Sequence, residues 1–158
     1  MITMEIPRSV QLEHAAIHAA LVDATAAAEP VGAAARELAR VLHPHFVREE
    51  EIALPPLGLL ARLADGGDGT RISGPETTVV LTMTDALKRE LPQMLEEHAR
   101  IRTAVEELRR AAIAAHDTAS ERLASQLALH AQNEEEVLYP AAIVVGELIR
   151  VRARTSND

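Results

Sequence analysis

The chain has 158 residues, a formal net charge of −8, one phenylalanine, one tyrosine and no tryptophan, and its lack of cysteine excludes disulfides and thiolate chemistry. Its length is typical of one domain with a sizeable core, and its acidic balance without a basic stripe argues against a nucleic-acid partner. Because the sequence shows neither a signal peptide nor an apolar run of membrane-spanning length, we expect a cytoplasmic protein without a membrane partner.

Aliphatic residues and alanine recur at helical spacing along nearly the whole chain, and most prolines and glycines stand outside these periodic segments. The pattern predicts an all-α fold, with a single domain over 1–158. Four long helices are accompanied by a short extra helix after the second of them and by a C-terminal helix. In chain order, the predicted helices span 8–28, 32–54, 56–64, 79–114, 118–139 and 141–152.

Capping and turn residues set several of these boundaries. Ser9 is a candidate N-cap for the first helix. Thr118 with Glu121 fits a capping box at the start of the helix before the last. The glycine-rich segment within 65–78 predicts a loop between the short extra helix and the long helix that follows it.

Three of the eight prolines are expected to bend, divide or separate predicted helices. Pro92 removes a backbone donor and should kink or divide its helix. Pro44 frees the carbonyl of Arg40 in the same way and should bend its helix next to a histidine. Pro140 should separate the last two helices.

One motif occurs twice, as HFVREEEIALP over 45–55 and as HAQNEEEVLYP over 130–140. Each copy begins with a histidine, has a glutamate four positions later and ends at a proline. A Glu-His-x-x-Ile segment lies upstream of each copy, at 13–17 and at 97–101. The chain therefore contains an internal pseudo-repeat, whose copies span about 8–55 and 92–140. Two such helical hairpins predict a four-helix bundle with approximate two-fold symmetry.

Four histidines and two glutamates of this repeat lie in the apolar stripes of their helices. For example, His45 and Glu49 continue the stripe that Leu38 and Leu42 begin. A buried ionised carboxylate without a partner costs on the order of several kcal/mol, and a bound cation removes that cost. The six candidate metal ligands are therefore His14, His45, Glu49, His98, His130 and Glu134.

The types of these side chains indicate two transition-metal ions. A His-x-x-x-Glu segment places an imidazole and a carboxylate on one face of a helix. Two carboxylates midway between two ions can bridge them, so that each ion holds two histidine nitrogens and one oxygen from each glutamate. Nitrogen and oxygen donors without sulfur suit Fe, Mn or Zn, with Fe preferred. An octahedral ion keeps positions for a bridging oxo or hydroxo and for O2, peroxide or NO.

The chain resembles the hemerythrin HHE cation-binding domain family from about Glu13 to Arg150, on the segments LEHAAI, HFVREEEIALPPL, EEHARI and HAQNEEEVLYPAA. The resemblance implies an up-down four-helix bundle around a non-haem di-iron centre. It places the ligands of the family on the same six residues and the bridges on Glu49 and Glu134. Members of the family bind O2, sense iron or oxygen, or act on peroxide or NO, so the resemblance implies no single activity.

The sequence is closer to the bacterial H–HxxxE–H–HxxxE members than to the invertebrate oxygen carriers. Those carriers have a His-x-x-x-His on the third helix and a His-then-Asp pair on the fourth. This chain has His98 followed by Arg102, and it has Glu134 in place of the aspartate. Four histidines instead of five argue against reversible carriage of O2.

The three remaining histidines have separate interpretations. His18 lies four positions after His14 and is either a seventh ligand or, as we favour, a residue that lines the surroundings of the site. His43 lies far around its helix from the ligand face, next to solvent or to the short helix. His116 is expected in the loop before the helix that begins near 118.

Other polar residues of the repeat are not predicted to bind metal. Glu13 and Glu97 either orient a neighbouring side chain or line the end of the bundle. Tyr139 is expected near the end of the bundle, with a redox or hydrogen-bonding role as the less favoured alternative. A solvated helix face is expected for Glu50, Glu51, Glu135 and Glu136.

Two functions from different classes follow from these observations. The first is a non-haem di-iron protein that binds, senses or reduces a small oxidant such as O2, peroxide or NO, with no catalytic side chain apart from the ligands. The second is a non-enzymatic, metal-responsive regulatory or partner-binding module, in which metal binding sets the stability of the bundle. The sequence is compatible with an enzyme and with a binding protein, and with a monomer and a homo-oligomer.

Overall fold

The structure is a computed structural model that describes residues 4–66 and 71–155, and within these ranges it is helical without a strand. Its α-helices are α1 (Arg8–Thr25), α2 (Val31–Ile52), α3 (Leu60–Asp65), α4 (Gly74–Ala114), α5 (Thr118–Asn133) and α6 (Tyr139–Thr155). The 3₁₀ segment η1 (Pro55–Leu59) precedes α3, and the π-helical segment η3 (Glu134–Leu138) joins α5 to α6. The expected all-α fold is confirmed. None of the described helices is long and apolar enough to cross a bilayer.

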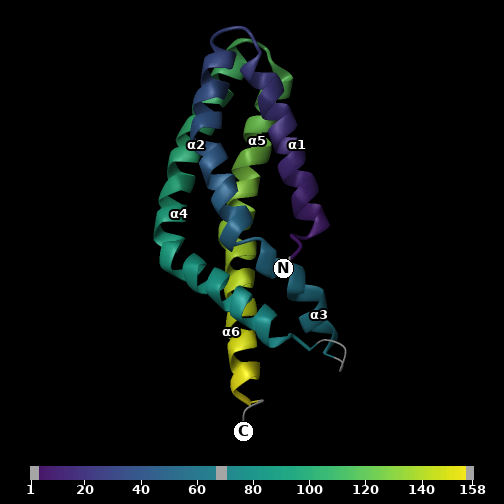
Figure 1. Cartoon of the computed structure of the whole chain (residues 1–158). Coiled ribbons are helices and arrows are strands. Elements are labelled where there is room, and N and C mark those ends of the chain that lie inside the picture. Colours follow the sequence, from purple (N-terminus) through teal and green to yellow (C-terminus); the bar gives the residue numbers. More distant parts are fainter. Residues whose placement is uncertain (1–3, 67–70, 156–158) are drawn as a thin grey trace.

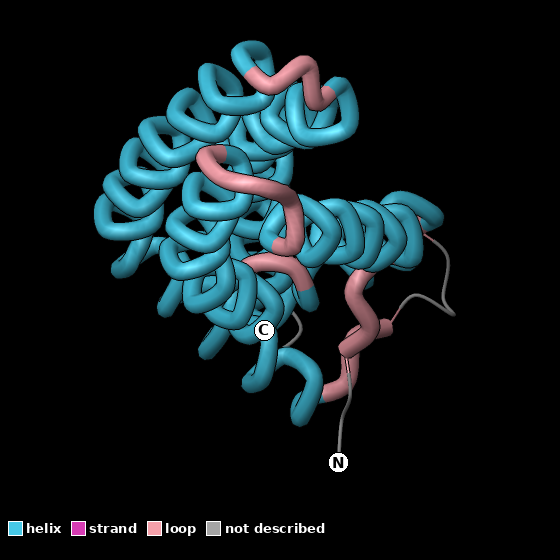
Figure 2. The backbone as a smooth tube through the Cα atoms, turned by 90° about the horizontal axis from the view of Figure 1, so that it is seen from above, coloured by secondary structure: helices cyan, strands magenta, loops and turns pink. Residues whose placement is uncertain are grey.

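Helices α1, α2, α4 and α5 pack around a common core. Helix α1 lies against α2 and α5, and α4 also lies against α2 and α5. Figure 1 shows the loops after α1 and after α4 at the same end of the molecule. Figure 2 views the helices from that end and shows that short loops connect them. The arrangement is compatible with the four-helix bundle that the repeat predicts.

The apolar core of these helices forms two clusters, because the inward stripes are interrupted by polar residues. Ile17 and Leu127 belong to the first cluster, whereas Val10 and Met94 belong to the second. His14 lies in sequence between Val10 and Ile17, and the other three candidate histidines also stand between members of the two clusters. The candidate site therefore lies between two apolar layers that exclude water from it.

Helix α4 also packs on α6, around Thr84 and Lys88. Gly146 allows the close approach, because a Cβ atom there would lie only 2.2 Å from Thr84 Oγ1. The ion pair between Lys88 Nζ and Glu147 Oε1, at 2.8 Å, joins the same two helices. Figure 1 shows α6 extending beyond the ends of α1 and α2 along this contact.

Helix α4 begins at Gly74, five positions before the predicted start at 79. The Ser73 hydroxyl accepts a hydrogen bond from the Glu76 amide at 3.2 Å, and the Glu76 carboxylate accepts one from the Ser73 amide at 2.8 Å. This capping box satisfies backbone donors at the helix start. The predicted loop over 65–78 is correspondingly shorter, and its residues 67–70 lie outside the described residues.

Two other predicted caps are wrong. The N-cap of α1 is Pro7 instead of Ser9. The N-cap of α5 is Asp117, whose carboxylate accepts a hydrogen bond from the Ser120 amide at 3.0 Å, and Thr118 is the first residue of that helix. Aspartate satisfies the free amide groups of a helix start as well as threonine does, so the capping function is present one position earlier.

All three prolines lie within continuous helical segments. Pro44 and Pro92 lie inside continuous helices, and Figure 1 shows that α4 bends along its length. The predicted break at Pro140 is absent, because helical conformation continues from η3 into α6. Pro140 is the second residue of α6, and a proline is tolerated in the first turn of a helix.

Candidate metal centre

The structure brings all six predicted ligands together between the four packed helices. Each is buried: 6% of His14 is exposed, and between 0% and 2% of the other five. Each of the four core helices supplies one histidine. Helix α2 also supplies a glutamate, and the second glutamate comes from the start of η3. In chain order they are His14 on α1, His45 and Glu49 on α2, His98 on α4, His130 on α5 and Glu134 on η3.

Their donor atoms form two overlapping sets. The first set consists of His14, Glu49, His130 and Glu134, and the second of His45, Glu49, His98 and Glu134. Within each set, one donor atom of every residue lies within 4.8 Å of the others. Both glutamates belong to both sets, so the grouping is the predicted one of two imidazoles and two shared carboxylates for each ion.

The two oxygens of each shared carboxylate face different sets. Glu49 Oε2 lies 4.0 Å from His14 Nε2, whereas Glu49 Oε1 lies 3.1 Å from His45 Nε2. Glu134 Oε1 lies 3.7 Å from His14 Nε2, whereas Glu134 Oε2 lies 3.2 Å from His98 Nε2. A carboxylate whose oxygens are divided in this way is placed to bridge two cations.

Four atoms of the first set are buried without a hydrogen-bond partner, namely His14 Nε2, Glu49 Oε2, His130 Nε2 and Glu134 Oε1. Only 2.8 Å separates His130 Nε2 from Glu134 Oε1, but their orientation is not that of a hydrogen bond. Each buried polar atom without a partner costs about 1–3 kcal/mol. A cation that contacts two nitrogens and two oxygens satisfies all four atoms at once, so the residues present fit a metal ion.

A second carboxylate contacts each imidazole from its outer side, at Nδ1. An Nδ1–H group that donates to a carboxylate leaves the lone pair of Nε2 directed toward the inside of the site. Metal-binding histidines commonly have this arrangement. The four outer pairs are His14–Glu50 at 3.3 Å, His45–Glu97 at 2.7 Å, His98–Glu135 at 2.8 Å and His130–Glu13 at 3.0 Å.

The prediction of a solvated face is confirmed for Glu51 and Glu136, which are exposed. It is wrong for Glu135, which is partly buried between His98 and Arg102. Glu50 is exposed as predicted, but it also contacts an imidazole. The repeat contains a signal for this role: a glutamate follows the shared carboxylate in both copies, and a glutamate precedes the upstream histidine in both copies. For the two upstream glutamates, the alternative of orienting a neighbour is confirmed.

Tyr139 lies inside the core beside the second set, although the sequence analysis placed it near the end of the bundle. Its hydroxyl donates a hydrogen bond to Glu49, and its oxygen lies 3.3 Å from His45 Nε2 and 3.2 Å from His98 Nε2. Burial and the negative charges of Glu49 and Glu134 raise the pKa of Tyr139. The less favoured prediction of a hydrogen-bonding role is confirmed.

The carboxylates favour positive charge at His45 and at His130. Burial lowers the pKa of His45, but Glu49 and Glu97 outweigh burial and raise this pKa to about 9. The pKa of His130 is also raised to about 9, again by its two carboxylate partners against the effect of burial. Burial and the charge of Glu134 raise the pKa of Glu49. The site therefore attracts protons in the absence of a metal ion, and a metal ion must displace them.

The other three histidines belong to neither set. His18 is exposed, which argues against its role as a seventh ligand. His43 is exposed, in line with its expected place away from the ligand face. His116 lies in the loop between α4 and α5 with a φ of 54°, as expected for a loop residue.

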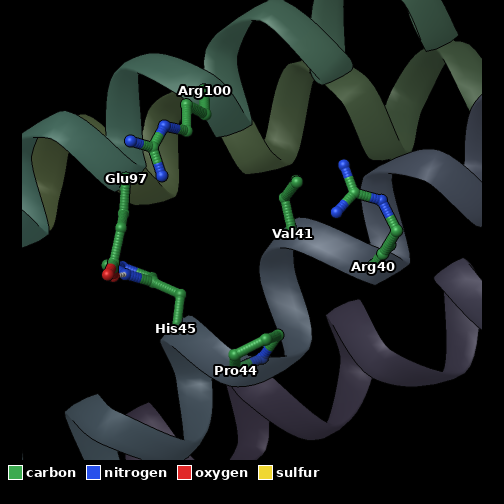
Figure 3. Close-up of a pocket in the computed structure, with 6 residues that line it drawn as sticks. All are labelled: Arg40, Val41, Pro44, His45, Glu97 and Arg100. Atoms are coloured by element: carbon green, nitrogen blue, oxygen red, sulfur yellow. Dashed lines mark hydrogen bonds and ion pairs between the residues drawn. The ribbon is translucent and has the colours of Figure 1, made fainter.

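A cavity of about 230 Å³ reaches the outer side of His45. Figure 3 shows Glu97 directed toward the ring of His45 on one side of this cavity, with Pro44 and Arg40 on the other. Because Pro44 has no amide hydrogen, the carbonyl of Arg40 lacks its helical donor on this side. Glu97 and His45 both line this cavity.

The fold and the site define an all-helical protein with a buried cluster of histidines and glutamates that could hold metal ions. Comparisons with family models, with curated proteins and with solved structures found no match to the chain.

Proposed function

We propose that the chain is a di-metal protein of the hemerythrin HHE type, an up-down four-helix bundle that binds, senses or reduces a small oxidant such as O2, peroxide or NO. The observation that supports this most strongly is the division of the Glu49 and Glu134 oxygens between two sets of imidazoles. With this division, each carboxylate can give one oxygen to each of two neighbouring cations.

Iron is the proposed metal, and Zn and Mn are the alternatives. The donors are imidazole nitrogens and carboxylate oxygens without sulfur, which suits these ions. When bound, a pair of redox-active ions supplies electrons and open coordination positions to the oxidant. His14, His45, His98 and His130 would hold the ions through Nε2, and Glu49 and Glu134 would hold both ions through their divided oxygens.

The remaining residues support this role by orienting the ligands and by excluding water. The outer carboxylates hold the imidazoles with Nε2 inward, and the two apolar clusters cover the site on both sides. Because the apolar clusters close the site from both sides, a small oxidant fits it better than a large substrate does.

Metal analysis of protein produced in iron-supplemented medium tests the proposal, with two ions expected for each chain. The iron-loaded protein should change its near-ultraviolet absorption when peroxide or NO is added. Glu49→Gln should lose both ions, because both sets share this carboxylate, whereas Glu51→Gln should keep both. Fewer than one ion per chain would refute the metal site, and iron-loaded protein without a response to peroxide or NO would refute the choice of ligand.

A second candidate function is a metal-responsive regulatory or partner-binding module. Glu134 opens the π-helical segment that leads without a break into α6, so a change in its contacts acts directly on the C-terminal helix. This candidate predicts that removal of metal lowers the melting temperature and loosens α6 in hydrogen-exchange measurements. It fails if the chelated and the loaded protein exchange and melt alike.

A further inference from the structure

The two sets have the same histidine and glutamate composition but different aromatic neighbours. The Phe46 ring stacks on His14 of the first set, with 4.1 Å between centroids and 7° between planes. The Tyr139 ring stacks on His98 of the second set, at 5.6 Å and 19°. These are the one phenylalanine and the one tyrosine of the chain, so each set has an aromatic neighbour that the other lacks.

The pseudo-repeat itself contains this difference. At the spacing of 85 positions that relates His45 to His130, the counterpart of Tyr139 is Leu54. Leu54 is fully buried in the second apolar cluster and has no polar side-chain atom. The first set therefore has no hydroxyl in the position that Tyr139 occupies at the second.

The phenol oxygen lies among the donor atoms of the second set. It is hydrogen-bonded to Glu49 and lies 3.3 Å from His45 Nε2 and 3.2 Å from His98 Nε2. Two donors bound to one ion at right angles, each by a bond of about 2.1 Å, are separated by about 3 Å. The spacing of the phenol oxygen is therefore that of a further donor to the same ion.

The π-helical segment explains how Tyr139 reaches this position. In a regular α-helix, a residue five positions after Glu134 would lie about 140° around the helix axis from it. Instead, the Tyr139 amide donates to the carbonyl of Glu134, an i to i+5 hydrogen bond. The wider turn brings Tyr139 back toward the side of the helix that carries Glu134, so both face the same site.

We propose that Tyr139 supplies its phenol oxygen as a fifth protein donor to the ion of the second set, which makes the two metal positions unequal. This inference rests on the proposed di-metal function. When the oxygen–metal bond forms, the O–H bond of Tyr139 breaks and its proton leaves to solvent. The first ion has four protein donors and the second has five, so fewer coordination positions of the second ion remain for an exogenous ligand.

A calorimetric titration of chelated protein with Zn²⁺ tests the inequality. Wild-type protein should bind two ions in two distinguishable steps. Tyr139→Phe keeps the ring and removes only the oxygen, and it should weaken one step by about tenfold or more. His130→Ala removes a ligand of the first set alone, so Tyr139→Phe should weaken binding in that background. It should leave binding unchanged in the His45→Ala background, where the second set is incomplete.

The possible results of this titration distinguish a failure of Tyr139 ligation from a failure of the proposed di-metal function. Two ions bound equally well by wild type and Tyr139→Phe would overturn the role of Tyr139 and leave the di-metal function standing. An equal loss at both steps would also overturn it, because the hydroxyl would then act through the shared Glu49. Wild-type protein that binds no ion would overturn both proposals.

The absorption spectrum of the iron-loaded protein gives a second test. A tyrosine oxygen bound to Fe³⁺ produces a visible charge-transfer absorption, and the chain has one tyrosine to which it can be assigned. Wild-type protein loaded with Fe³⁺ should show this band, and Tyr139→Phe should lack it. Loaded wild-type protein with two ferric ions and no such band would contradict ligation by Tyr139.

Discussion

At the scale of single residues, each imidazole of the site has an inner and an outer carboxylate neighbour. His98, for example, faces Glu134 through Nε2 at 3.2 Å and Glu135 through Nδ1 at 2.8 Å. Arg102 contacts the same Glu135 at 2.8 Å. A residue that cannot bind metal thus contributes by holding the carboxylate that orients a ligand.

Replacement of Glu135 by glutamine tests this outer contact. Glu135→Gln keeps the shape of the side chain and removes its charge, so we expect metal affinity to fall by about 10- to 100-fold. The matched control is Glu136→Gln in the same acidic run, because Glu136 is exposed and contacts only Gln132 among the interactions described. Competition with a chelator measures the metal affinity of both variants. Equal affinities for the two variants would contradict an orienting role for Glu135.

The inner residues of the site were predictable, whereas the outer carboxylates were predictable only in part. An orienting role was one of the alternatives for Glu13 and Glu97, but it was not expected for Glu50 or Glu135. His45 and Glu49 share the spacing of a buried helical stripe, and that spacing alone places them inward. Whether Glu50 turns to solvent or across to His14 depends on how closely the next helix packs, which local spacing does not encode. The position of Tyr139 was missed because the π turn after Glu134, which brings Tyr139 toward the site, was not predicted.

At the scale of secondary structure, most helices were predicted and the π-helical segment was not. The residues of η3, EEEVL, contain nothing that separates them from an ordinary α-helix. The π turn satisfies tertiary contacts, since Glu134 and Tyr139 both face the site. The early start of α4 was predictable from Ser73 and Glu76, whose capping box stands next to the glycine-rich loop.

The packing of α4 on α6 predicts the effect of a substitution at Gly146. In Gly146→Ala, the new Cβ would lie 2.2 Å from Thr84 Oγ1 and 2.7 Å from Thr84 Cβ, and overpacking of this kind costs about 1–3 kcal/mol. We expect a lower melting temperature with an unchanged number of bound ions. Gly74→Ala is the control, since no atom lies within 4 Å of its Cβ position. Thermal unfolding that is alike in both variants would contradict the close contact.

At the scale of the whole molecule, the site links folding to pH. The pKa values of His45 and His130 are raised from 6.5 to about 9 in the folded chain. A raised pKa stabilises the fold fully below the unfolded value, and the stabilisation is lost as pH rises through the folded value. Each shift corresponds to about 3 kcal/mol. Chelated protein should therefore lose stability between about pH 6.5 and 9.

Urea unfolding of chelated and Zn²⁺-loaded protein across this pH window measures the effect. The loaded protein should not lose stability there, because the ion holds the imidazoles in their neutral form and takes the place of the protons. Chelated protein whose free energy of unfolding is constant or rises across the window would contradict the proposed charge balance. The free energy of unfolding should therefore depend on pH in this window only when the two ligand sets hold no metal ion.

The repeat predicted the general arrangement of the molecule better than its details. Two hairpins with matching histidines and glutamates indicated helices that meet around one site, and the described helices pack in this way. The repeat did not predict the extension of α4 along α6, because 74–91 has no counterpart before α1. Departures from the repeat, at Tyr139 and at Phe46, distinguish the two ligand sets.

Anomalous diffraction from crystals of iron-loaded protein tests the central claim most directly. The account predicts two iron peaks in each chain, one among the donors of each set and both beside the carboxylates of Glu49 and Glu134. A single peak, or peaks remote from these two carboxylates, would contradict the claim that six buried side chains hold a pair of ions.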